Sequence, residues 1–174
     1  MIQLMTNYLC ISRFLSTNIE CTLACRIPLP CTEELIPHVE LPLAIDIIKD
    51  IREHDGKSTA VHAKVIAKDF VTIYDHPKQK IPDYSKSEAK TFLVFPDDSA
   101  ISINEAFPIG KSYEKSRIIF IDATWKQARQ LAKSPSLSYL PRIKLSLQTQ
   151  TLYWRYQTGE SDSNLATIEV LILF

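Results

Sequence analysis

A carboxylate, a hydroxyl and an indole lie close together in this chain, at Asp122, Thr124 and Trp125. They directly follow an apolar run, residues 118–121, and precede a segment rich in basic side chains. In open α/β sheets, the crevice beyond the carboxyl end of a strand is where ligands usually bind. A carboxylate at such a position can accept a proton or a hydrogen bond from a substrate. The pattern therefore predicts a ligand site at Asp122.

Asp122 and Trp125 also have structural interpretations. An acid just before a helix often caps the helix or interacts with its dipole. Thr124 with Gln127 forms a capping box, however, which would leave Asp122 outside the helix with its carboxylate facing the crevice. Helical periodicity gives Trp125 an inward face, whose other members are Ala128, Leu131 and Ala132. The alternative is that the indole stacks on a base or faces a ligand cation.

Positive charge is concentrated in one part of the chain, although the net charge is zero. Residues 111–157 hold nine basic and two acidic side chains, a net charge of +7, whereas residues 1–110 carry −4 and residues 158–174 carry −3. In the helix after Asp122, three cations share one face: Lys126, Arg129 and Lys133. This segregation indicates a surface for a polyanion; the alternative is a solvated basic face.

Two other segments could contribute to a site. The acidic turn at residues 96–99 follows an apolar strand as Asp122 follows another, so the two loops meet if these strands are parallel neighbours. The alternative for this acidic turn is a solvated loop. Residues 153–157, Tyr-Trp-Arg-Tyr-Gln, interleave aromatics with a cation and suit base stacking and phosphate contact. The alternative there is a half-buried edge strand.

The elements that would position these residues follow an α/β pattern. Apolar runs predict strands at 43–48, 70–74, 91–95, 117–121 and 143–147. Ser58 or Thr59 is expected to cap one helix, and Thr124 begins another that Pro135 ends. The connection 75–90 reads as a surface loop, residues 1–40 as an irregular arm, and residues 168–174 as a buried terminal element or the end of a truncated domain. Together these elements predict a mostly parallel sheet with flanking helices.

Several classes of site and protein are disfavoured. The three glycines of the chain are too far apart to form the dinucleotide-binding fingerprint. Residues 56–59, Gly-Lys-Ser-Thr, resemble the end of a P-loop, but the earlier glycine that this motif needs is replaced by Ile51. No apolar stretch is long enough to span a membrane, and the N-terminus does not read as a signal peptide, so we expect an intracellular protein.

Four cysteines lie in the first fifth of the chain, at Cys10, Cys21, Cys25 and Cys31. Their spacing is not a standard zinc spacing, so we expect reduced structural cysteines and no metal. Cys21, Cys25 and Cys31 remain the candidates for a zinc-nucleated interaction domain, which is one alternative class of function.

Four ordered blocks resemble the DTW-domain family: Leu93–Pro96, Asp122–Trp125, Arg155 with Gln157, and Leu165–Glu169. The resemblance covers roughly residues 41–170. Three further segments make the chain most similar to the eukaryotic DTW-domain-containing protein 1 subgroup: residues 41–48, 56–60 and 153–157.

This resemblance implies a tRNA-uridine aminocarboxypropyltransferase that uses S-adenosylmethionine as co-substrate and modifies N3 of a tRNA uridine. It also implies a SPOUT-like fold, knotted near the C-terminus, and a location in the nucleus or the cytosol. The expected domain spans residues 41–174 and is truncated at its C-terminal end, after the N-terminal segment 1–40.

The resemblance, the expected chemistry and the basic segment together give three groups of expected site residues. The catalytic group is Asp122, Thr124 and Trp125. The group that binds S-adenosylmethionine is Leu93, Phe95, Pro96, Leu165, Thr167 and Glu169. The group that binds tRNA is Lys126, Arg129, Lys133, Arg142, Lys144, Trp154 and Arg155. The alternative to an enzyme is a non-catalytic RNA-binding module with an incomplete cofactor site.

Overall fold

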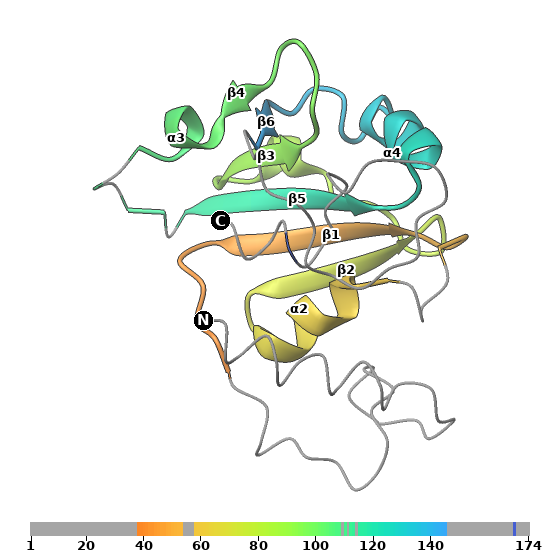
Figure 1. Ribbon diagram of the computed structural model, residues 1–174, viewed down its shortest axis with the longest axis horizontal. Helices are drawn as coiled ribbons and strands as arrows, with labels where there is room; N and C mark the ends of the chain where they lie inside the picture. The colour runs from red at the N-terminus through yellow and green to blue at the C-terminus, as the bar shows by residue number, and fades with distance from the viewer. Residues whose placement is uncertain are drawn as a thin grey trace, which may run out of the picture.

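A computed structural model describes residues 38–53, 58–108, 110, 112–113, 115–145 and 169. In this part of the chain, six parallel strands form one sheet in the order β2-β1-β5-β3-β6-β4 (Figure 1). The strands are β1 (Ala44–Asp50), β2 (Val71–His76), β3 (Lys90–Val94), β4 (Ile101–Ser102), β5 (Ser116–Asp122) and β6 (Arg142–Lys144). The helices are α2 (Ala60–Ile66), the 3₁₀ turn η2 (Tyr84–Lys86), α3 (Ile103–Ala106) and α4 (Trp125–Ala132). This architecture confirms the predicted α/β fold with a parallel sheet and flanking helices.

Strand β5 lies between β1 and β3, two strands that precede it in the chain. It pairs with β1 along one edge, where Ile47 lies opposite Phe120, and with β3 along the other, where Phe92 lies opposite Ile118. The apolar residues in the middle of these strands, such as Ile47, Phe92 and Ile118, are buried, as expected for strands covered on both faces.

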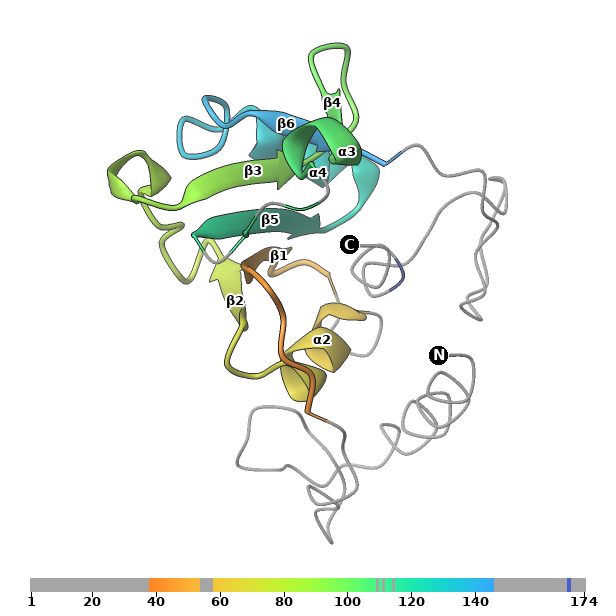
Figure 2. The same cartoon turned by 90° about the vertical axis from the view of Figure 1, so that its left-hand side faces the viewer.

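The two faces of the sheet carry separate hydrophobic cores. On one face, α2 packs against Ile45, Ile47 and Phe120, and α3 lies beside the same face (Figure 2). On the other face, Leu131 of α4 packs against a core that includes Ile48 and Ile119. The chain therefore leaves β1 toward one face and leaves β5 toward the opposite face.

Helix α2 begins where the sequence predicted, but its buried side is built from small residues. Ala60 and Ala63 are buried, as is Ala67 just after the helix, whereas Val61 and Val65 are only partly buried. Alanines on this side allow the helix to lie close to the sheet. Thr59 is the N-cap residue, and its side chain makes no capping hydrogen bond.

The connection 75–90 is more ordered than the predicted surface loop. Strand β2 extends to His76, and both Ile81 and Tyr84 are buried in the core on the α4 face. The Tyr84 hydroxyl donates to Asp46 Oδ2 at 2.9 Å, and Arg117 Nη1 donates to the same oxygen at 2.7 Å. A carboxylate 1% exposed needs such donors, which explains why this connection folds back over the sheet.

Two elements escaped sequence analysis, namely β4 and the short helix α3. Ser102 and Glu105 form a capping box, with Glu105 accepting from the Ser102 N–H at 2.7 Å. The spacing Ser-x-x-Glu is itself a helix-start signal and could have revealed this turn. The expected strand 143–147 is present as β6, which starts one residue earlier and ends at Lys144. Residues 146 and 147 of the expected strand lie outside the described part. No helix among the described residues is long and apolar enough to cross a membrane.

Candidate active site

The carboxyl ends of β1 and β5 form the switch point of the sheet, at the right of Figure 1. These two strands are adjacent and parallel, and their connections lead to helices on opposite faces. In open α/β sheets, ligands usually bind beyond the ends of strands whose connections diverge in this way. The residues predicted to be catalytic lie at this point.

Asp122 is the last residue of β5 and is 7% exposed. Its Oδ2 accepts a hydrogen bond from Ser58 Oγ at 2.6 Å, although 64 positions separate the two residues. Ser58 is also buried and lies just before α2. The distance lies at the short end of the range for hydrogen bonds between two oxygens. The Asp122 side chain is thus held by the segment between β1 and α2.

Thr124, rather than Asp122, caps helix α4. Its backbone is extended, with φ −62° and ψ 155°, and Gln127 Oε1 accepts from the Thr124 N–H at 3.0 Å. The predicted capping box is therefore confirmed.

Lys49 of β1 lies opposite Asp122 of β5 in the register of the sheet. The two side chains project from the same face, because residues paired across neighbouring strands share a face. Lys49 is 5% exposed, and its Nζ lies 3.7 Å from Oδ1 of Asp75, near the end of β2. A buried cation thus lies among carboxylates at the ends of three adjacent strands.

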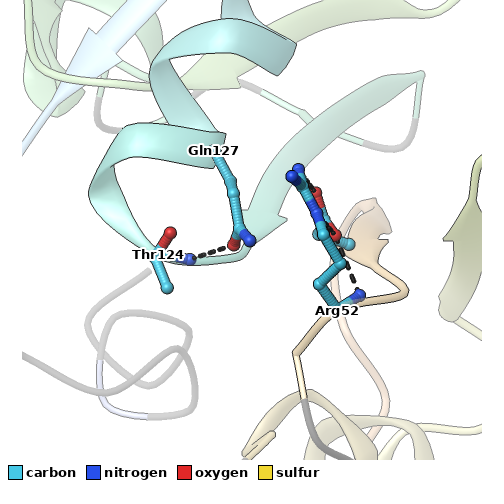
Figure 3. A network of polar contacts seen from close by, with 4 residues as sticks. Arg52, Thr124 and Gln127 are labelled. Carbon is cyan, nitrogen blue, oxygen red and sulfur yellow. Dashed lines mark hydrogen bonds and ion pairs between the residues drawn. The ribbon is translucent and has the colours of Figure 1, made fainter.

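A second ion pair lies on the other side of β1. Arg52 donates from Nε to Asp50 Oδ1 at 2.8 Å and from Nη2 to Oδ2 at 2.7 Å, and its N–H also donates to Oδ1. These hydrogen bonds hold the pKa of Asp50 below its usual value of 3.8. Figure 3 shows Arg52 with its hydrogen bonds, in the same view as the capping bond between Thr124 and Gln127. The Arg52 side chain is 60% exposed, so a cation already held by Asp50 is accessible just beyond the end of β1.

Trp125 is 48% exposed, so the prediction that its indole shares the buried face of α4 is wrong. The other three residues of that face are buried: Ala128, Leu131 and Ala132. Trp125 occupies the first position of the helix, directly beyond the end of β5, where the sheet no longer covers it. The indole is therefore exposed at the start of α4, three residues after the end of β5.

The cationic face of α4 is exposed at all three of its residues: Lys126, Arg129 and Lys133. Lys144 at the end of β6 is exposed as well. Arg142 differs, because its guanidinium pairs with Asp97, donates to the carbonyl of Ala132 and lies over the ring of Phe95. Arg142 therefore has structural partners inside the fold.

The acidic turn after β3 is a structural loop. Asp97 accepts from the N–H of Ser99 at 2.9 Å and from its hydroxyl at 2.7 Å, in addition to its pair with Arg142. Because β3 and β5 are parallel neighbours, this turn does lie at the same edge of the sheet as Asp122, as predicted. Its carboxylate at Asp97, however, is used in ordering the loop.

The residues predicted to bind S-adenosylmethionine fall into three environments. Leu93 is fully buried, and its N–H donates to the carbonyl of Pro141; the N–H of Phe95 donates to the carbonyl of Ile143. Pro96 is exposed, and Glu169 is a buried helical residue. The remaining predicted residues lie outside the described part of the chain: Leu165, Thr167, Trp154 and Arg155, with Cys21, Cys25 and Cys31. Among the described residues, no group of three or more histidine, cysteine or acidic side chains is arranged to hold a metal ion.

Sequence analysis missed three polar residues of this edge: Lys49, Arg52 and Ser58. Lys49 carried one available signal, since a charged residue ending a buried strand is unusual. Ser58 was considered only as a helix cap or as part of a failed P-loop. Its contact with Asp122 depends on how two distant connections meet, which spacing does not reveal.

Comparison with known proteins adds an independent finding. The family model described as the DTW domain matches residues 19–174. The curated protein tRNA-uridine aminocarboxypropyltransferase 1 of Mus musculus is 36% identical over 179 residues, covering 81% of this chain and 58% of that protein. Its namesake in Homo sapiens is 34% identical over 170 residues, covering 76% and 55%. The chain therefore spans a little over half the length of these relatives. No solved structure matches it.

Proposed function

Because this chain belongs to the DTW domain family, we propose that it takes part in tRNA modification as a tRNA-uridine aminocarboxypropyltransferase. The relatives carry this activity in their names. The observation that carries the proposal is the position of Asp122: a buried, hydrogen-bonded carboxylate at the switch point, beside an exposed indole and an exposed cationic helix face. A tRNA substrate is consistent with a location in the nucleus or the cytosol.

The proposed donor is S-adenosylmethionine, and the proposed acceptor is N3 of a uridine. The donor supplies an activated carbon: the N3 electron pair forms a bond to the methionine γ-carbon, the carbon–sulfur bond breaks, and its electron pair neutralises the sulfonium to give methylthioadenosine. The N3 proton must leave, so the site needs an acceptor within hydrogen-bond reach. Asp122 accepts the N3–H hydrogen bond, orients the uracil and receives this proton as the new bond forms.

The polar residues at the crevice suit such a donor. A sulfonium cation is stabilised by the face of an aromatic ring and by a carboxylate, which Trp125 and Asp122 provide. The transferred group carries its own carboxylate, and Arg52 presents a guanidinium already fixed by Asp50. The segment ending at Phe95 and Pro96, with Glu169 and the predicted Leu165 and Thr167, holds the rest of the donor.

The exposed cations of α4, together with Lys144, bind tRNA phosphates next to the crevice. Such contacts position the tRNA without specifying its sequence. Trp154 and Arg155, which lie outside the described residues, contribute base stacking and phosphate contact in this proposal. Arg142 supports it indirectly, since it orders the turn after β3.

The test is to incubate the purified chain with tRNA and S-adenosylmethionine and analyse the nucleosides by mass spectrometry. We expect a uridine that carries one aminocarboxypropyl group and release of one methylthioadenosine for each group transferred. Binding of tRNA without donor binding in calorimetry, and without product, would instead identify a non-catalytic RNA-binding module.

A further inference from the structure

The bond between Ser58 and Asp122 joins two connections that leave the sheet toward opposite faces. Ser58 lies between β1 and α2, and Asp122 lies at the entrance to α4. Both side chains are buried, and their oxygens are 2.6 Å apart. A buried bond of this kind restricts the rotation of the carboxylate, since breaking it would leave a polar group without its partner.

Sequence analysis left open whether Ser58 or Thr59 caps helix α2. Serine is a preferred N-cap residue, and loss of a capping bond destabilises the helix. In the structure the N-cap position falls on Thr59, whose side chain makes no such bond, while the Ser58 hydroxyl is directed to Asp122. The start of α2 thus forgoes a local side-chain cap, while a hydroxyl next to it contacts a carboxylate 64 residues away.

The charge environment supports the same orientation. Lys49 is buried on the same face of the sheet, directly opposite Asp122 in register, and lies 3.7 Å from Asp75 on its other side. Ser58, in the segment between β1 and α2, therefore orients Asp122 through a hydrogen bond, and Lys49 of β1 lies on the same face of the sheet.

We propose that Ser58 is a positioning residue that holds the Asp122 carboxylate in the orientation in which it meets the substrate, with Lys49 providing the neighbouring positive charge. This inference rests on the proposed transferase function and extends it to a segment outside residues 122–125, the DTW motif. Ser58 acts only through Asp122.

The first test compares Ser58→Ala with the original protein in the transferase assay. We expect kcat to fall about 10- to 100-fold, as is typical when the partner of a functional ligand is removed. KM values for tRNA and donor should stay within about threefold, because binding contacts remain. Ser58→Thr, which keeps the hydroxyl, should restore most of the rate. Equal kcat for Ser58→Ala and the original protein would overturn the proposal.

A matched control is available at Ser85, whose hydroxyl also donates to a carboxylate, Asp83, at 2.6 Å. This pair is exposed and is not part of the crevice. Ser85→Ala should leave kcat unchanged. A loss equal to that of Ser58→Ala would show that removing any such hydroxyl has this effect.

Two further measurements separate positioning from general structure. In an Asp122→Asn background, Ser58→Ala should cause no additional loss, because its effect passes through Asp122; an undiminished further loss would contradict the proposal. If Ser58→Ala does not fold, Ser58→Cys keeps the size with a weak donor and takes its place.

Crystal structures of the original protein and of Ser58→Ala show directly whether the Asp122 rotamer changes. A changed Asp122 rotamer in the Ser58 variant supports positioning even if the original protein makes no modified uridine, in which case only the proposed function fails. An unchanged rotamer overturns the positioning role.

Discussion

At the scale of single residues, partners decide what each side chain can do. Asp122 could be identified from sequence because it ends an apolar strand and because Thr124 supplies a separate cap. Its contact with Ser58 could not, since that contact depends on the meeting of two connections. For Trp125 the sequence pattern was misleading. Helical periodicity assigned the indole to the core, but the helix starts beyond the sheet and leaves it 48% exposed.

Replacing Asp122 tests the catalytic role of this carboxylate. Asp122→Asn keeps the shape but removes the charge and most of the capacity to accept a proton, so we expect kcat to fall by about 100-fold or more. The control is Asp98→Asn, which neutralises an exposed acid in the turn after β3. Full transferase activity of Asp122→Asn, measured from methylthioadenosine release, would rule out this role.

Removing the exposed indole tests whether Trp125 contacts a ligand. Because the ring is nearly half exposed, Trp125→Ala should change the free energy of unfolding by only about 0.5 kcal/mol. Loss of a stacking or cation contact should raise KM for tRNA or donor about tenfold. Tyr139→Ala removes another exposed aromatic, 47% exposed, and should leave KM unchanged. The same KM for both variants would remove Trp125 from the site.

The Asp50–Arg52 pair makes stability depend on pH in a defined direction. The pKa of Asp50 is lowered in the folded state, so its contribution is complete above the ordinary value of 3.8 and is lost as the pH falls through the lower folded value. Asp50→Asn should lower the free energy of unfolding by about 1 kcal/mol at pH 7. This is less than a buried charged hydrogen bond contributes, because solvent screens the exposed Arg52. Urea unfolding should show this difference shrinking in acid. A difference that is constant down to pH 2 would be inconsistent with the pairing.

At the scale of elements, local signals were reliable where they agreed with burial. The starts of α2 and α4 and the apolar strands were predicted close to their observed bounds. The segment 75–90 was misjudged because Ile81 and Tyr84 are buried by tertiary packing, and Tyr84 serves the buried carboxylate of Asp46. Helix α4 shows how one element serves both roles, with an apolar side in the core and a cationic side exposed.

The cationic side of α4 makes a quantitative prediction about tRNA binding. Each phosphate contact to a duplex contributes about 0.9 to the slope of log K against log salt. Replacing Lys126, Arg129 and Lys133 with alanine should therefore reduce this slope by about 2 to 3. The control replaces Lys78 and Lys80, exposed in the connection after β2. An unchanged slope in the α4 variant would place tRNA elsewhere on the molecule.

At the scale of the whole molecule, the order of the strands determines where the site lies. The alternation of strands and helices predicted a parallel sheet, and the structure confirms it. The insertion of β5 between β1 and β3 could not be read from the sequence, because the central strands are similar in length and apolar character. That insertion brings the connection after β1 next to the DTW motif, and so brings Ser58 and Lys49 to Asp122.

The central claim is that the site around Asp122 transfers an aminocarboxypropyl group to a tRNA uridine. The most direct measurement is nucleoside mass spectrometry of tRNA from cells that lack this protein, with the gene returned in its original form or as Asp122→Asn. We predict that one aminocarboxypropyl-uridine disappears, returns with the original gene and stays absent with the variant. An unchanged nucleoside profile in cells without the protein would contradict the proposed function, and recovery with Asp122→Asn would contradict the proposed site.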